Sequence, residues 1–161
     1  MSTMQIDASR QAINVSGGGG TTDFATTAFV FCHTGWKTDS GDSITVNTDN
    51  NEYYIDVYKA GGGQWIEWYI WIKEGTYSLT LFYYQSSNAT KIDIALDGTN
   101  IVSAFDCYIG AFNPHIKTIQ TGIVVSTAGT HTVRFTSNGK NASSTDYHMG
   151  LFHFLFQRTG A

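Results

Sequence analysis

Proline and charge are both scarce in this chain. Among 161 residues there is one proline, Pro114, and Asp, Glu, Lys and Arg together make up only 14%. Because proline cannot donate a backbone hydrogen bond, its near absence leaves little to interrupt paired strands. The low charge indicates a surface that is largely neutral and polar, or one that a partner covers.

Basic clusters and long apolar runs are also missing. The net charge is −4 and the Lys and Arg residues do not gather in any stretch, whereas a nucleic-acid-binding surface needs them to neutralise phosphates. The chain has no apolar run of about 18 residues and no charged start followed by an apolar segment. We therefore expect no nucleic-acid partner, no membrane span and no standard secretion signal.

Cysteine is limited to Cys32 and Cys107. The two thiols either pair with each other or remain free as small buried apolar side chains. Their spacing does not match that of a zinc site. The sequence leaves both alternatives open.

Glycine and aromatic residues, in contrast, are plentiful, with 17 Gly and with Phe, Trp and Tyr together at 14%. Runs of Gly, Thr, Ser and Asn supply turns between short strands, and no segment has the 3.6-residue period of an amphipathic helix. The length suits one domain with a real core. We predict an all-β protein, an antiparallel two-sheet β-sandwich (jelly roll) of about nine or ten strands.

Apolar residues that recur at every second position locate the strands. Residues 74–82 and 128–135 share one template, in which a Gly-Thr turn leads into such a strand. The dipeptide Asp97-Gly98 marks a tight hairpin, because glycine accepts the positive φ of these turns. The predicted strands cover residues 28–33, 43–46, 53–58, 64–73, 77–84, 91–97, 101–105, 116–126, 130–136 and 147–157.

Four consecutive glycines occupy residues 17–20. Such a run costs too much backbone entropy to lie inside a regular element, so it predicts a hinge. We expect an N-terminal arm and hinge over residues 1–20 and a single jelly-roll domain over residues 21–161. The arm is either a frayed terminus or a segment that docks on a neighbouring chain.

Two predicted strands have two apolar faces. In residues 64–73 the aliphatic face suits the interior, while the opposite face has a size and aromatic content typical of an interface or a ligand platform. In residues 147–157 both faces look buried, which indicates packing against another subunit. We expect three side chains of the first strand to make subunit contacts unless a loop or the arm covers them, or ligand contacts if the protein is a monomer: Trp65, Tyr69 and Trp71. The two faces predicted for the second strand are Phe152, Phe154 and Phe156 on one side and Met149, Leu151, His153 and Leu155 on the other.

Four stretches share a pattern of alternating strands and Gly-led turns: residues 65–72, 75–79, 93–98 and 128–133. Together they resemble the galactose-binding-like β-sandwich of carbohydrate-binding modules, over roughly residues 53–157. Residues 138–144 resemble a segment of jelly-roll domains in bacteriophage structural proteins. Many of the carbohydrate modules hold calcium with an N-terminal acidic pair, whereas this chain has only Asp7 and Asp23 there. Because the chain departs from the family pattern at this point, we predict no metal and no cofactor.

Sugar recognition needs a flat aromatic ring against the pyranose face and polar groups for its hydroxyls. On this fold such groups usually lie in the loops at one end of the sandwich or on one sheet. Each candidate also has a structural alternative. A loop aromatic can anchor the sandwich edge, and residues 138–141 (Asn-Gly-Lys-Asn) predict a turn in which Asn bonds its own backbone. The candidates are Trp36, Tyr108, Phe112, Asn138 and Asn141.

The histidines and acidic residues form no recognisable catalytic or metal-binding pattern. We therefore predict a protein that is not an enzyme. The resemblance to bacteriophage structural proteins, together with the predicted arm and hinge, implies a virion structural protein, a subunit that decorates a capsid or tips a fibre. Its expected partners are copies of itself, with a trimer favoured, other virion proteins and host surface glycans, at the virion surface. The alternative is a carbohydrate-binding module, extracellular by a route not visible in the sequence.

Overall fold

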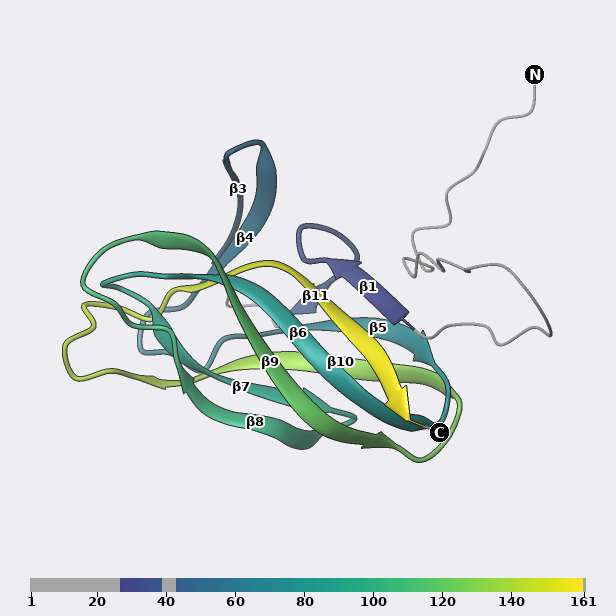
Figure 1. Ribbon diagram of the computed structural model, residues 1–161. Helices are drawn as coiled ribbons and strands as arrows, with labels where there is room; N and C mark the ends of the chain where they lie inside the picture. Colours follow the sequence, from purple (N-terminus) through teal and green to yellow (C-terminus); the bar gives the residue numbers. More distant parts are fainter. Residues whose placement is uncertain (1–26, 39–42, 161) are drawn as a thin grey trace, which may run out of the picture.

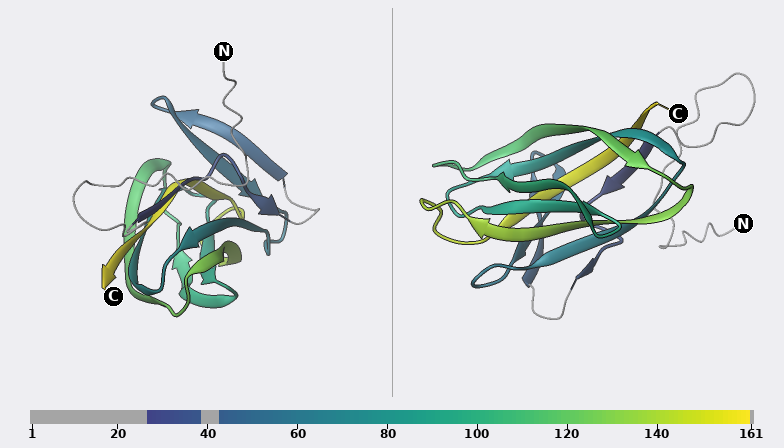
Figure 2. Two further views of the ribbon diagram at one scale, coloured as in Figure 1. Left: turned by 90° about the vertical axis from the view of Figure 1, so that its right-hand side faces the viewer. Right: turned by 90° about the horizontal axis from the view of Figure 1, so that it is seen from below.

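The computed structural model describes residues 27–38 and 43–160, which form two antiparallel sheets packed face to face (Figures 1 and 2). This part of the chain has no helix, and so none that is long and apolar enough to span a membrane. The predicted two-sheet β-sandwich is confirmed. The predicted arm and hinge over residues 1–20 lie outside the described residues.

The described residues contain eleven strands, and each predicted segment overlaps one of them. The strand that was not predicted is β2, which has two residues. The strands are β1 (Thr27–Phe31), β2 (Lys37–Thr38), β3 (Ser43–Asp49), β4 (Glu52–Tyr58), β5 (Trp65–Ile72), β6 (Gly75–Gln85), β7 (Thr90–Leu96), β8 (Thr99–Asp106), β9 (Asn113–Val125), β10 (Gly129–Lys140) and β11 (Met149–Gly160).

The six-stranded sheet has the order β3-β4-β11-β6-β9, with β1 also paired to β11, and the five-stranded sheet has the order β2-β5-β10-β7-β8. Strand β11 changes neighbour along its length, since residues 149–151 pair with β4 and residues 153–157 pair with β1. Because β4 leaves the sheet where β1 enters it, the β3–β4 hairpin projects from the sandwich (Figure 1).

Alternating apolar side chains fill the space between the sheets. The inner-facing side chains of β5, at positions 66, 68, 70 and 72, are all buried, as predicted. The ring of Trp68 packs edge-on against Phe135 of β10 at 5.6 Å and against Phe154 of β11 at 5.4 Å, measured between ring centroids. Aromatic contacts of this geometry add to the stabilisation from burial alone, so β5, β10 and β11 are fixed to one another through this cluster.

The predicted faces of β11 are wrong before residue 153, whereas Phe154 and Phe156 share the core face as predicted. A β-bulge between Leu151 and His153 shifts the alternation by one residue. As a result Leu151 and Phe154 both join the core, whereas Phe152 turns to the outer side and its ring lies 5.1 Å from that of Tyr54 in β4. The hairpin of the same chain therefore covers this side of β11, and burial of the strand requires no second subunit.

The two Asx-Gly sites behave differently. Asp97 and Gly98 have φ values of 49° and 80° and join β7 to β8 through the pair Leu96–Thr99, which confirms the predicted hairpin. The turn predicted around residues 138–141 is wrong at its start, because β10 continues through it to Lys140 with Gly139 at a φ of 76°.

Cys32 and Cys107 are both free and buried. Burial raises the pKa of both thiols, because desolvation disfavours the thiolate. Both side chains therefore act as small apolar residues, which is one of the two alternatives that the sequence left open.

Candidate functional site

The outer face of β5 presents exposed aromatic side chains. Tyr69 is 55% exposed and Trp71 is 44% exposed, while Trp65 on the same face is half-buried. Strand β5 pairs with β10 over residues 65–72, and with β2 at Ile66 and Glu67. Tyr69 and Trp71 therefore project from a regular strand that β10 holds in register, and their Cα atoms, two positions apart, are about 6.8 Å from each other.

A row of threonines runs beside these rings on β10. The register places Thr130 opposite Trp71 and Thr132 opposite Tyr69. Residues directly opposite each other in an antiparallel pair have Cβ atoms about 4.5–5.5 Å apart. Each threonine hydroxyl both donates and accepts hydrogen bonds. We call Tyr69, Trp71, Thr130 and Thr132 the aromatic–threonine face.

An ion pair borders this face. The Glu67 side chain is only 3% exposed, and its Oε2 accepts hydrogen bonds from Arg134 Nε at 2.8 Å and Nη2 at 2.7 Å. Lys37 Nζ lies 3.6 Å from Glu67 Oε1. The Arg134 guanidinium also lies 4.1 Å above the Trp65 ring. Trp65 is therefore partly covered by Arg134, and the Glu67 carboxylate is committed to two cations.

The loop candidates lie elsewhere. Tyr108 and Phe112 belong to the β8–β9 loop, and Asp106 links that loop to Asn141, because its carboxylate accepts the Tyr108 N–H at 2.9 Å and the Asn141 amide at 2.7 Å. Asn138 donates to both carboxylate oxygens of Asp93. Both candidate amides are thus engaged within the chain.

Among the aromatic candidates, Phe112 is 52% exposed and Trp36 is 37% exposed. Trp36 directly precedes β2, and β2 pairs with β5 through Lys37 and Glu67. The structure therefore places Trp36 along the edge of the five-stranded sheet, apart from the end loops that hold Tyr108 and Phe112. The candidates do not come together in one site.

A second polar cluster lies under the tip of the β3–β4 hairpin and was not predicted. His115 Nε2 lies 2.7 Å from Asp49 Oδ2 and His115 Nδ1 lies 3.1 Å from Glu52 Oε2. His153 Nδ1 lies 2.9 Å from Glu52 Oε1, and its ring stacks on Phe82 at 4.1 Å. Among the described residues no three His, Cys, Asp or Glu side chains have the geometry of a metal site. We infer that these contacts hold the β3–β4 hairpin against β9 and β11.

Burial lowers the pKa of His153, and the nearby His115 acts in the same direction against the opposing effect of Glu52. A desolvated imidazole resists protonation. No sequence signal marks this cluster, because its members come from the β3–β4 hairpin, from β9 and from β11, which are far apart along the chain.

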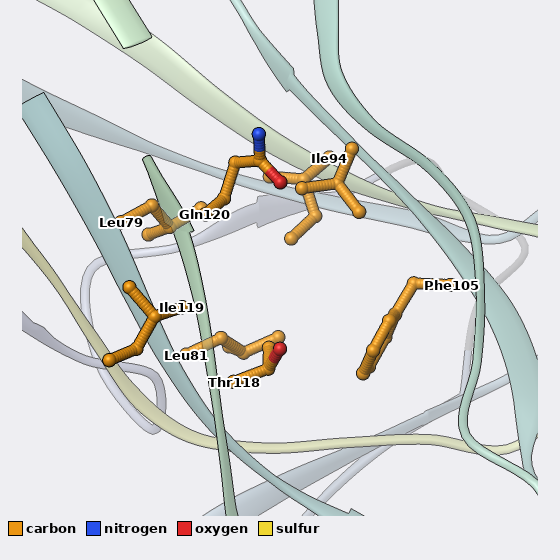
Figure 3. A pocket seen from close by; sticks show the side chains of 8 residues that line it. Leu79, Leu81, Ile94, Phe105, Thr118, Ile119 and Gln120 are labelled. Carbon is orange, nitrogen blue, oxygen red and sulfur yellow. The ribbon is translucent and has the colours of Figure 1, made fainter. Parts of the chain in front are cut away.

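The sandwich is hollowed along the free edges β8 and β9. A small apolar pocket of about 70 Å³ opens between the sheets, and side chains such as Leu79, Leu81, Ile94 and Phe105 line it (Figure 3). A larger cleft of about 470 Å³ follows toward the β7–β8 hairpin, and Gln120 borders both. Only the larger cleft has the size of a small-molecule site.

Comparison with solved structures places the fold among the β-sandwiches of carbohydrate-binding modules. The CBM36-1 domain of a multidomain xylanase from the hindgut metagenome of Trinervitermes trinervoides superposes with a TM-score of 0.62 at 16% identity, over 84% of this chain and 99% of that domain. The CBM35 of Paenibacillus barcinonensis superposes with a TM-score of 0.59 at 15% identity, over 82% and 99%.

A Paenibacillus xanthan lyase superposes with a TM-score of 0.66 at 21% identity, over 76% of this chain, but the match spans only 12% of the lyase. No family model and no curated protein matches the sequence. Identities this low show the fold alone. The superpositions confirm the predicted resemblance to the β-sandwich fold of carbohydrate-binding modules. The likeness to bacteriophage proteins stays a prediction.

Proposed function

We propose that this protein binds carbohydrate on the aromatic–threonine face. The observation that carries the proposal is the exposure of Tyr69 and Trp71 on a regular strand, directly beside the hydroxyls of Thr130 and Thr132. A pyranose ring presents an apolar C–H face that stacks on an aromatic ring and a rim of hydroxyls that pair with polar groups. The aromatic–threonine face offers both partners side by side.

The expected affinity is modest. A Trp or Tyr side chain buries about 150–250 Å² when fully covered, so covering the exposed half of each ring removes about 100 Å² from water. At about 25 cal/mol per Å² this contributes about 2.5 kcal/mol per ring. The two rings together contribute about 5 kcal/mol, which corresponds to a Kd of about 0.2 mM before the loss of ligand freedom is counted. That loss weakens the binding from the two rings to the millimolar range or beyond.

The solved relatives of the fold support this choice of ligand class. One CBM36 structure contains calcium and xylotriose, and a CBM6 of Clostridium stercorarium contains cellobiose. They match this chain with TM-scores of 0.52 and 0.56. We infer binding rather than catalysis, because Glu67, the carboxylate nearest to the rings, is held by Arg134 and Lys37.

The same exposed rings also suit a contact between subunits, as the virion interpretation requires. The trimer, the virion surface and partners among virion proteins stay predictions from the sequence. Carbohydrate binding is the better-supported function, because the named structures of this fold include glycan complexes.

Isothermal titration with xylotriose and cellobiose tests the proposal. Tyr69→Ala and Trp71→Ala should each weaken binding about tenfold or more, which corresponds to about 1.4 kcal/mol or more. The matched control is Tyr53→Ala, a tyrosine that is 53% exposed on β4 of the other sheet. If Tyr69→Ala and Trp71→Ala both bind as tightly as the unchanged protein, the proposed site is wrong. If neither glycan binds to the unchanged protein, the proposed function is wrong.

A further inference from the structure

The cleft of about 470 Å³ between β8 and β9 is distinct from the aromatic–threonine face. Its walls are residues 120–127, the β7–β8 hairpin and His131. It lies at the free edge of the five-stranded sheet, whereas β5 and β10 lie inside that sheet. The aromatic–threonine face lies on the outer surface of a sheet, whereas the cleft has walls from two strands and a hairpin and suits a single ring or a chain end.

Asp97 presents a fixed carboxylate to this cleft. Its Oδ1 accepts the backbone N–H of Thr132 at 2.8 Å, and its Oδ2 accepts His131 Nδ1 at 2.6 Å. The side chain is still 51% exposed. A carboxylate has about four lone-pair positions, so Asp97 keeps acceptor capacity for a ligand after these two bonds.

His131 is held between two partners. Its Nδ1 faces the Asp97 carboxylate at 2.6 Å and its Nε2 faces the carbonyl oxygen of Thr127 at 3.0 Å. Both partner groups are hydrogen-bond acceptors. The ring therefore orients the Asp97 carboxylate as an acceptor at the cleft.

The electrostatics of Asp97 agree with this reading. Partial burial acts to raise the pKa of Asp97, but the hydrogen bonds from the Thr132 N–H and from His131 outweigh it and hold this pKa below its ordinary value. The carboxylate therefore stays ionised, and stays an acceptor, over the neutral and mildly acidic range.

We propose that this cleft is a second ligand site, which takes a neutral hydroxyl-rich ligand such as a single sugar ring or a chain end. Asp97 would accept hydrogen bonds from neighbouring ligand hydroxyls. Threonine side chains and apolar groups such as Ile101 and Val124 also line the cleft. The threonines suit the hydroxyl groups of a sugar, and the apolar groups suit its C–H face. The choice of a sugar rests on the proposed function, whereas the site itself rests on the cleft and the His131–Asp97 pair.

An NMR titration of the full-length chain with xylose, cellobiose and xylotriose tests the proposal. We expect amide shifts at Asp97, Thr99 and residues 121–127 with xylose alone. Asp97→Asn keeps an acceptor for Thr132 N–H and a residue that tolerates the turn, but it removes the charge, and it should weaken xylose binding at least tenfold. Val124→Trp, at a position 72% exposed on the cleft wall, should block the cleft without altering Asp97.

The outcomes separate this site from the proposed function. Shifts confined to β5 and β10, lost in Trp71→Ala, would overturn the second site and leave the proposed function intact. Shifts at the cleft that survive Trp71→Ala and vanish in both Asp97→Asn and Val124→Trp would support the second site, and the aromatic–threonine face would then be judged by separate shifts on β5 and β10 that Trp71→Ala removes. Shifts at the cleft with calcium chloride alone, or no shifts with any of the three sugars, would overturn the second site.

Discussion

Replacement of Glu67 by Gln is the sharpest test of how the aromatic–threonine face is held. The carboxylate is 3% exposed and receives two hydrogen bonds from Arg134 within 2.8 Å. Glutamine keeps the shape of the side chain but removes the charge and turns one acceptor into a donor that faces the guanidinium. Arg134 then loses its ionic partner and is no longer held over Trp65.

The magnitude follows from burial on each side of the pair. Breaking a fully buried ion pair costs about 3–5 kcal/mol, but the Arg134 side chain is 43% exposed and regains water when released. We therefore expect a loss of about 1–2 kcal/mol in the free energy of unfolding. For a chain of this length that loss lowers Tm by about 2–8 °C.

Urea unfolding followed by circular dichroism measures this loss. Glu74→Gln is the matched control, because Glu74 is exposed in the β5–β6 turn and its replacement should change stability by less than about 0.5 kcal/mol. A double-mutant cycle with Arg134→Gln isolates the coupling between the two side chains. A coupling energy near zero would refute the argument that Glu67 and Arg134 stabilise each other.

Three further predictions concern other parts of the molecule. Val102→Ile should fill the apolar pocket of about 70 Å³ and raise stability by up to about 0.8 kcal/mol, and a lower Tm would show that the pocket cannot accept a methylene. The pKa of His153 is lowered in the folded state, so the free energy of unfolding should fall as the pH drops from about 6.5 through that lowered value. Thermal melts at several pH values should show this fall, and His153→Gln should make the pH dependence smaller. Light scattering should report a trimer if Tyr69 and Trp71 form subunit contacts, with Trp71→Ala shifting the mass toward the monomer, whereas a monomer throughout would remove the oligomer prediction.

The alternation of apolar residues was enough to predict the strands and the inner face of β5, because a two-residue period directly encodes which side of a strand faces the core. The same rule failed on β11, where one extra residue between Leu151 and His153 reverses the alternation. A bulge of this kind leaves no mark in composition. Its position is decided by the register with β6, which lies some 70 residues earlier in the chain.

The functional residues were predicted only in part. The exposed rings of Tyr69 and Trp71 followed from the pattern of β5, but the burial of Glu67 did not, because it depends on Arg134 in a different strand. Asp97 was recognised as a turn residue, yet its pairing with His131 depends on how β7 and β10 align. Partners brought together by sheet register cannot be derived from spacing along one chain.

The position of β11 in the six-stranded sheet has a consequence for folding during synthesis. This strand pairs with β1, β4 and β6, and all three leave the ribosome before it does. Until residues 149–160 emerge, the inner strands of that sheet lack a neighbour and expose apolar side chains. Pairing over such long separations is intrinsically slow, so the insertion of β11 should be the late and slow step in completing the six-stranded sheet.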